Sequence, residues 1–300
     1  MNKRNDFICI GAVHSDYLLN LKQNYFKNRT NPIIQKENLG GVAYNVAKTL
    51  AFLDQKTNLY SINCNKDQKN EIKKNGIFFK SISQKIEKRY YASIIDRNGK
   101  MIFGLANMDN YEKIADNHLI KKFKNKNIIL DLNLSKKLIE KIINTNHHNN
   151  YICVCGTSAH KIYKIKNLLK KINTLILNKQ ESFKLTNKKS IKDSLRFLSN
   201  KNKKLNIIIT NGKNSVNAYI KNIYYLSYPN NIRIKNENGA GDTLSAVFNY
   251  FYCNNYDILE SLNKSICAGM LQASGYNKKK VNYLKKVQKL SKSIRYKIIN

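Results

Sequence analysis

Residues 236–248 read NENGAGDTLSAVF, with two glycines and an acid directly before an apolar stretch at helical spacing. A helix N-terminus carries a positive partial charge, and glycine lets an anion approach without meeting a Cβ atom. We therefore expect Gly239, Ala240 and Gly241 to form an anion hole. Asp242 is then expected to be a base for an attacking hydroxyl group. Taken alone, these four residues could also form a tight turn with an ordinary helix acid.

The rest of the chain alternates short apolar runs with segments of helical periodicity. This alternation indicates a mainly parallel sheet covered by helices on both faces. The expected strands are 6–13, 57–62, 126–132, 151–155, 174–178, 205–210 and 216–220. The expected helices are 42–54, 134–144, 160–172, 240–253, 258–274 and 280–291.

Two segments, 15–39 and 77–106, break this alternation and lack long helical periodicity. Within the second, Asn98-Gly99 lies between two β-rich arms, which is a strong signal for a hairpin. We expect a small antiparallel β piece beside the α/β core.

Composition sets broad limits on the partners of the chain. The net charge is +35, but the lysines are spread along all 300 residues, and this favours a general compositional bias over a specific nucleic-acid site. No apolar stretch is long enough to predict a transmembrane helix, and residues 6–13 are interpreted as a strand rather than a signal peptide. The six cysteines contain no CxxC pair, which favours reduced thiols and a cytoplasmic location.

Further polar and glycine residues lie where strands are expected to end. In open α/β folds, ligands bind at the carboxyl edge of the sheet, so these residues are candidates for one common site. A carboxylate directly after a strand is also suited to hold magnesium or its waters. The candidates are Asp16, Gly40-Gly41 with Asn45, Asn178 with Glu181, and Thr210 with Gly212.

This set of motifs resembles the PfkB (ribokinase-like) family of sugar and nucleoside kinases over nearly the whole chain. The family's three motifs appear here as Gly40-Gly41…Asn45, Asn178–Glu181 and Gly239–Asp242. The resemblance implies a ribokinase-like three-layer α/β/α sandwich with a mainly parallel central sheet and a small β lid. It implies one domain over 1–300, with the lid in segments of approximately 15–39 and 77–106.

The resemblance also implies the reaction, which is transfer of the γ-phosphoryl group of ATP to a hydroxyl group, with Mg²⁺. A monovalent cation stays open as a further cofactor. Asp242 would be the base and Gly239, Ala240 and Gly241 the anion hole. The matched residues for the acceptor are Asp16, Gly40, Gly41 and Asn45. Those beside the nucleotide are Asn178, Thr210, Gly212 and Asn238, while Glu181 would organise Mg²⁺ through water. A homodimer through the lid is possible in this family.

Three segments are similar to pseudouridine kinases within the family: IFGLANMDNYEKI (102–114), ILDLNLSK (129–136) and Val281-Asn282. They imply phosphorylation of the 5′-hydroxyl group of pseudouridine. Another sugar or nucleoside stays open as the acceptor, and so does a noncatalytic relative that binds nucleosides or nucleic acid. The positions that depart from the family pattern are His14, Asn107, Cys155-Gly156, Ser215 and Asn236–Asn238.

Overall fold

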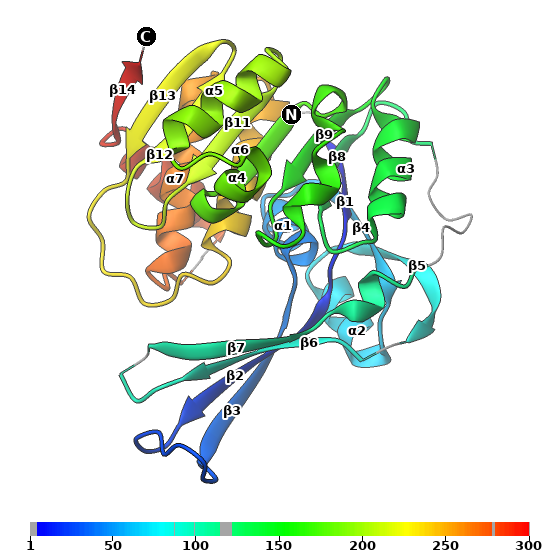
Figure 1. The fold of residues 1–300 in the computed structure, drawn as a ribbon, viewed down its shortest axis with the longest axis vertical. Coiled ribbons are helices and arrows are strands. Elements are labelled where there is room, and N and C mark those ends of the chain that lie inside the picture. Colours follow the sequence, from blue (N-terminus) through cyan, green and yellow to red (C-terminus); the bar gives the residue numbers. More distant parts are fainter. Residues whose placement is uncertain (1–4, 87, 99, 115–121, 278–279, 300) are drawn as a thin grey trace.

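The computed structural model describes residues 5–86, 88–98, 100–114, 122–277 and 280–299. It contains a ten-stranded sheet in the body of the molecule and a four-stranded sheet that projects from the body (Figure 1). Helices cover both faces of the larger sheet, so the predicted three-layer α/β/α sandwich is confirmed.

Strands and helices alternate along the chain, and elements at 66–74, 179–186, 191–201, 223–228 and 295–299 add to those that the sequence predicts. The strands are β1 (Asp6–Ile10), β2 (His14–Leu21), β3 (Ile33–Gly40), β4 (Lys56–Asn63), β5 (Phe78–Ile86), β6 (Tyr90–Ile95), β7 (Met101–Asn107), β8 (Asn127–Asp131), β9 (Tyr151–Cys155), β10 (Thr174–Asn178), β11 (Asn206–Thr210), β12 (Val216–Ile220), β13 (Ile223–Tyr228) and β14 (Arg295–Ile299). The α-helices are α1 (Val42–Phe52), α2 (Lys66–Lys74), α3 (Lys136–Asn146), α4 (Lys179–Thr186), α5 (Ile191–Lys201), α6 (Ala240–Cys253), α7 (Ile258–Ala273) and α8 (Lys280–Ser291). The 3-10 helices are η1 (Asp109–Tyr111), η2 (Ile162–Ile165) and η3 (Leu169–Lys171).

The large sheet has the strand order β14-β13-β12-β11-β10-β9-β8-β1-β4-β5. Strands from β11 to β5 run parallel, and β12, β13 and β14 extend the sheet in antiparallel pairs. In β1, Phe7 and Cys9 point into one core, while Ile8 and Ile10 point into the other. Burial on both faces explains why these strands read as continuous apolar runs.

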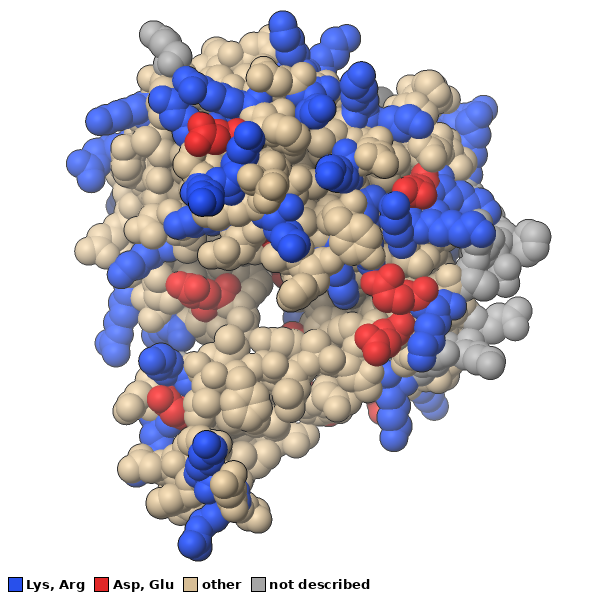
Figure 2. Space-filling model, in the orientation of Figure 1, with Lys and Arg blue, Asp and Glu red and all other residues tan. Residues whose placement is uncertain are grey.

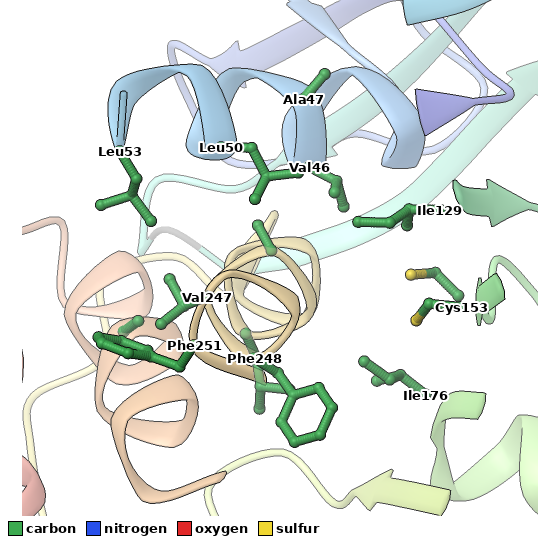
Figure 3. Packing of buried hydrophobic residues seen from close by; sticks show 14 of the residues in the cluster. Val46, Ala47, Leu50, Leu53, Ile129, Cys153, Ile176, Val247, Phe248 and Phe251 are labelled. Carbon is green, nitrogen blue, oxygen red and sulfur yellow. The ribbon is translucent and has the colours of Figure 1, made fainter. Parts of the chain in front are cut away.

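Helices α1 and α6 pack together on one face of this sheet (Figure 3). Val46 and Leu50 of α1 and Val247 of α6 belong to one buried cluster together with Ile129 and Cys153 of the strands. The opposite face is covered by α3, α4, α5 and the 3-10 helices η2 and η3. The first core therefore fixes α1 against α6.

The small sheet has the order β3-β2-β6-β7 and projects from the body (Figure 1). It contains most of segment 15–39, but segment 77–106 divides between the two sheets. Residues 90–107 supply β6 and β7, whereas β5 pairs in parallel with β4 at the edge of the large sheet. A strand's alternation does not reveal which sheet it joins, so the sequence could not separate the two parts. The expected hairpin joins β6 and β7, which pair in antiparallel fashion. Gly99 of its Asn98-Gly99 turn lies outside the described residues.

The expected helix 160–172 is wrong, because this segment forms the two short turns η2 and η3. Lys164 is buried there, and its Nζ atom donates to the carbonyl oxygens of Leu132 and Leu134 and contacts Glu112. These contacts tie the segment to the end of β8. The expected helix 280–291 is α8, and Arg295–Ile299, for which the sequence predicts no element, form β14 beside β13. The side chain of Val281 lies outside the described residues.

Lysine and arginine side chains are spread over both the body and the small sheet on the face shown in Figure 2. That face also shows a hollow between the small sheet and the body. Within the described ranges, the structure has no helix of the length and hydrophobicity that crossing a bilayer requires.

Candidate active site

The N-terminus of α6 is built as the sequence predicts. Gly239 has the left-handed φ of 73°, which glycine adopts readily, and Ala240 begins the helix. Among the described residues, no side chain caps this helix. The N–H group of Ala240 donates to the carbonyl oxygen of Glu237 at 3.1 Å, so the turn itself uses one of the three expected amides. A Cβ atom added to Gly241 would meet nothing within 4 Å, which leaves open space above the first turn.

Asp242 is joined to α1 by a direct hydrogen bond. Nδ2 of Asn45 donates to Oδ2 of Asp242 at 2.8 Å. The helices that carry the two residues share one buried core, to which the neighbouring Val46 belongs (Figure 3). Burial raises the pKa of Asp242 to about 6, and the negative charges of Asp131 and Asp16 act in the same direction. The Asn45 hydrogen bond favours the ionised form and partly opposes this rise. The carboxylate is thus a stronger base than an ordinary aspartate.

Asp16 lies on β2 in close contact with the start of α1. A Cβ atom added to Gly40 would lie 2.0 Å from Oδ2 of Asp16, so only glycine fits there. Gly41 has φ 112°, and its Cβ atom would lie 2.3 Å from the carbonyl oxygen of Ala12. On the other side of the carboxylate, Nδ1 of His14 lies 2.8 Å from Oδ1 of Asp16. The double glycine is thus required by close packing.

Two cavities meet at the N-terminus of α6. The first, here called the Asp16 cavity, has a volume of about 1000 Å³. The second, the Thr210 cavity, has a volume of about 660 Å³. Residues of the Asp16 cavity include Asp16, Asn38, Asn45, Asn238, Gly239 and Gln272. Those of the Thr210 cavity include Asn178, Thr210, Gly212, Lys213, Ala240 and Gly241. The glycine turn of α6 is therefore the wall that both cavities share.

On the Thr210 side, Asn178 and Glu181 form a reciprocal cap of α4. The Asn178 side chain accepts from the Glu181 N–H group at 2.9 Å, and Oε2 of Glu181 accepts from the Asn178 N–H group at 2.8 Å. Glu181 is 3% exposed, and burial raises the pKa of its carboxyl group to about 7. A Cβ atom on Gly156 would lie 2.0 Å from Oε2 of Glu181, which explains the glycine at this atypical position.

The expected nucleotide residues do not all share one cavity. Asn178, Thr210 and Gly212 line the Thr210 cavity, whereas Asn238 lines the Asp16 cavity. Asn238 lies in a turn, where its N–H group donates to Oδ1 of Asn236 at 2.9 Å. Adjacent residues of this turn face different cavities. The spacing of residues in the sequence does not predict which cavity each one faces.

The sequence motifs missed several wall residues of the Thr210 cavity. Its apolar wall includes Ile232, Ile266 and Met270, which come from a loop after β13 and from α7. These residues resemble ordinary core residues in the sequence, since a cavity wall and a core share the same apolar composition. Their location becomes visible only when α7 packs beside α6.

The parallel α/β sheet and the glycine-rich N-terminus of α6, with Asp242 in its first turn, agree with the ribokinase-like kinases that the motifs resemble. The chain belongs to the pfkB family of carbohydrate kinases, whose sequence profile matches residues 5–278. Membership implies a phosphotransferase that uses an alcohol group as acceptor.

Solved structures of this family share the whole fold. A carbohydrate kinase from Agrobacterium tumefaciens is 18% identical, with a TM-score of 0.81 over 98% of this chain and 100% of that one. Ribokinase from Thermotoga maritima is 13% identical, with a TM-score of 0.78 over 96% and 100%. A nucleoside kinase from Methanocaldococcus jannaschii is 18% identical, with a TM-score of 0.71 over 96% and 100%. Among curated proteins, no sequence gives a significant match.

Proposed function

We propose that this kinase transfers the γ-phosphoryl group of ATP to the 5′-hydroxyl group of pseudouridine and gives pseudouridine 5′-phosphate. The observation that carries the kinase reaction is the Asn45–Asp242 pair. Asn45 lines the Asp16 cavity, and Asp242 stands in the chain between Gly241 of the Thr210 cavity and Thr243 of the Asp16 cavity. The acceptor is assigned to the Asp16 cavity and ATP to the Thr210 cavity. The reacting hydroxyl group then meets the γ-phosphoryl group at the first turn of α6.

In this proposal, Asp242 takes the proton of the acceptor hydroxyl group as its oxygen attacks the γ-phosphorus. The bond between that phosphorus and the bridging oxygen breaks, and ADP leaves. A carboxyl pKa of about 6 leaves Asp242 ionised at neutral pH and still basic enough for this step. The α6 N-terminus at Gly239–Gly241 stabilises the negative charge on the transferred group.

Mg²⁺, when bound with ATP, supplies charge neutralisation on the phosphates. The residues fit an indirect role, because Glu181 offers one carboxylate in the cap with Asn178, which lines the Thr210 cavity, and magnesium commonly keeps several waters. Glu181 and Asn178 would hold the hydrated ion. Asn236, where an acid would favour a monovalent cation, instead supports the turn before α6.

The choice of pseudouridine is supported by the sequence resemblance rather than by contacts with a base. Two of the residues that carry the resemblance are engaged within the protein. The hydroxyl group of Tyr111 both accepts from the Val13 N–H group and donates to the Val13 carbonyl oxygen, and Asp131 is buried below the site. Discrimination between bases is therefore assigned to the wall of the Asp16 cavity, where Asn38 and Gln272 offer amide groups.

The test is phosphorylation of pseudouridine, uridine, adenosine, ribose and fructose 6-phosphate with ATP and Mg²⁺, read by product mass. We expect a product from pseudouridine and none from the Asp242→Asn variant. A product from another compound alone would retain the kinase and replace its substrate. If the folded protein phosphorylates none of them, the pseudouridine assignment fails and a noncatalytic binding role gains support.

The small sheet supports a second part of the proposal, a homodimer. Strand pairing places Tyr17, Leu19, Ile94, Phe103 and Leu105 on the face opposite Asp16. Phe103 is 42% and Leu105 49% exposed, and an apolar face of this kind is typical of an association surface. Since strand faces of two copies are alike, a second copy can pack on it symmetrically.

The dimer is tested by sedimentation of the wild type and of Leu105→Glu. We expect a dimer that becomes a monomer in the variant. A wild-type monomer at micromolar concentration would contradict this part alone. The six cysteines are free thiols, five of them buried, in keeping with the cytoplasmic location that we propose.

A further inference from the structure

A buried carboxylate lies where three elements of the acceptor side meet. Asp131 is the last residue of β8 and is 1% exposed. Its Oδ2 atom accepts from the N–H group of Ala12 at 2.8 Å and from the N–H group of Ala43 at 3.1 Å. Ala12 belongs to the connection from β1 to β2, and Ala43 to the first turn of α1. One oxygen atom thus joins β8, the start of the small sheet and α1.

The second oxygen of this carboxylate is also engaged. Oδ1 of Asp131 accepts from the backbone N–H group of Asn133 at 2.9 Å and from its Nδ2 atom at 3.1 Å. The side-chain oxygen of Asn133 accepts in turn from Nζ of Lys161 at 2.6 Å. The Asn133 amide therefore lies between the positive charge of Lys161 and the Asp131 carboxylate. These contacts offset part of the desolvation cost of burying Asp131.

The surrounding backbone leaves room only for this carboxylate. A Cβ atom on Gly11 would lie 2.2 Å from Cγ of Asp131. Gly41, the N-cap residue of α1, has no side chain with which to cap the helix. Asp131 therefore caps α1 from β8, because its oxygen accepts from a first-turn N–H group as a local N-cap side chain would. Its negative charge also stabilises the positive end of the helix dipole.

We propose that Asp131 is a positioning residue for phosphoryl transfer. By holding the first turn of α1, it sets the place of Asn45, which donates to the base Asp242. By holding the backbone of Ala12, it also sets where β2 begins, and so the place of Asp16. The carboxylate need not touch either substrate to do this. The inference rests on the proposed kinase reaction for its kinetic readout, but not for its structural one.

The test uses Asp131→Asn, which keeps the shape but turns one of the two accepting oxygens into a donor that faces N–H groups. The matched control is Asn146→Ala, which removes another buried side chain that accepts from a backbone N–H group, that of Phe123 at 2.8 Å. Asn146 lies on α3, so this control measures loss of stability without a change at α1. The structural readout is hydrogen–deuterium exchange of residues 40–50 in the free protein.

For Asp131→Asn we expect exchange of residues 40–50 to rise at least about tenfold, which corresponds to ~1.4 kcal/mol of local opening. The acceptor kcat/KM should fall by a similar factor or more, while KM for ATP stays unchanged. Asn146→Ala should lower the melting temperature and leave both readouts in place. If exchange at 40–50 stays as in the wild type, or if the activity loss follows stability alone, the proposal is overturned.

A second variant keeps the test valid if Asp131→Asn does not fold. Asn133→Ala retains the carboxylate and both Oδ2 hydrogen bonds, but removes the Nδ2 donor and the link to Lys161. We expect a smaller rise in exchange at residues 40–50, in the same direction. No rise in this variant would then overturn the proposal. If the wild type phosphorylates no compound of the panel, the substrate assignment fails while the exchange experiment still decides the role of Asp131.

Discussion

The two sides of the α6 N-terminus contain glycines for opposite reasons. On the acceptor side, a Cβ atom at Gly40 or Gly41 would lie 2.0 or 2.3 Å from protein atoms. On the nucleotide side, a Cβ atom at Gly212 or Gly241 would meet nothing within 4 Å. The first pair lets the protein pack against itself, whereas the second leaves space that a ligand can fill. The region around Asp16, which we propose for the acceptor, is therefore closely packed at the first two glycines, whereas the Thr210 cavity, which we propose for the nucleotide, has open space at the other two.

The largest expected effect comes from Asp242, the residue between the two sides. Asp242→Asn keeps the size of the side chain but cannot accept the proton, so phosphoryl transfer should fall by ~10²–10⁴-fold. Turnover with the accepted substrate measures the loss. Asp193→Asn is the matched control, because Asp193 lies in the first turn of α5, away from both cavities. Equal turnover in Asp242→Asn and the wild type would remove the base from the mechanism.

Glu181 on the nucleotide side gives the next effect, in stability rather than rate. Its carboxyl pKa is raised from 4.5 to about 7, so the folded state binds this proton more tightly than the unfolded state. The ionised group therefore lowers the free energy of unfolding as pH rises from about 4.5 to 7. One pKa unit corresponds to ~1.4 kcal/mol, so the full penalty above pH 7 is about 2–4 kcal/mol.

Glu181→Gln removes that penalty, because an amide has no charge to desolvate and its oxygen can still accept from Asn178. The cap of α2 already uses glutamine at the corresponding position, with Asn65 and Gln68. We expect the variant to be more stable than the wild type at pH 8, in urea unfolding without Mg²⁺ and ATP. The difference should shrink towards pH 5. A variant no more stable at pH 8 would show that Glu181 is not strained by burial.

Alanine at Gly40 and at Gly241 tests the comparison of the two sides directly. Gly40→Ala should displace Asp16, lower the melting temperature and raise KM for the acceptor about tenfold or more, which is ~1.4 kcal/mol. Gly241→Ala should leave the fold intact or stabilise α6 by up to ~1 kcal/mol, since alanine is the better helix former. Its methyl group should nonetheless reduce kcat by entering the phosphoryl space. Reversal of this pattern would contradict the assignment of closely packed and open sides.

The sequence could predict the parallel core because buried strands and amphipathic helices carry their own periodicity. It could not predict α2, whose residues are largely polar and whose only fully buried side chain among those described is Ile72. It also could not assign β5 to the large sheet, since alternation is the same in either sheet. The prediction of a helix at 160–172 was wrong because the apolar spacing there is helical, whereas the segment forms short 3-10 helices whose buried Lys164 is bonded to the residues after β8.

Within the site, motifs identified residues at chain turns but not the partners that hold them. Asp242 and Asn45 are 197 positions apart, and their contact depends on the packing of α1 against α6. The role of Asp131 was hidden for the same reason, because its partners Ala12 and Ala43 contribute only backbone N–H groups. Such contacts leave no side-chain pattern in a single sequence.

The smallest expected effect is a shift in the pH dependence of the reaction. Protonated Asp242 cannot act as a base, so kcat/KM of the wild type should fall as pH drops through about 6. Asn45 donates to the ionised form, so Asn45→Ala should raise the pKa and move this acid limb to higher pH. The charges of Asp131 and Asp16, which raise the pKa, and of His14, which lowers it, stay in place.

The readout for Asn45→Ala is the position of the acid limb in a profile of kcat/KM from pH 5 to 8, rather than its height. Loss of a contact with the phosphoryl-acceptor substrate lowers kcat/KM at every pH. Loss of the hydrogen bond to Asp242 instead moves the acid limb along the pH axis. Asn38→Ala is the matched control, because Asn38 lines the same cavity and should lower the profile without moving it. A limb that moves equally in both variants, or in neither, would mean that Asn45 does not tune the base. The acceptor side would then bind its substrate without controlling the proton transfer.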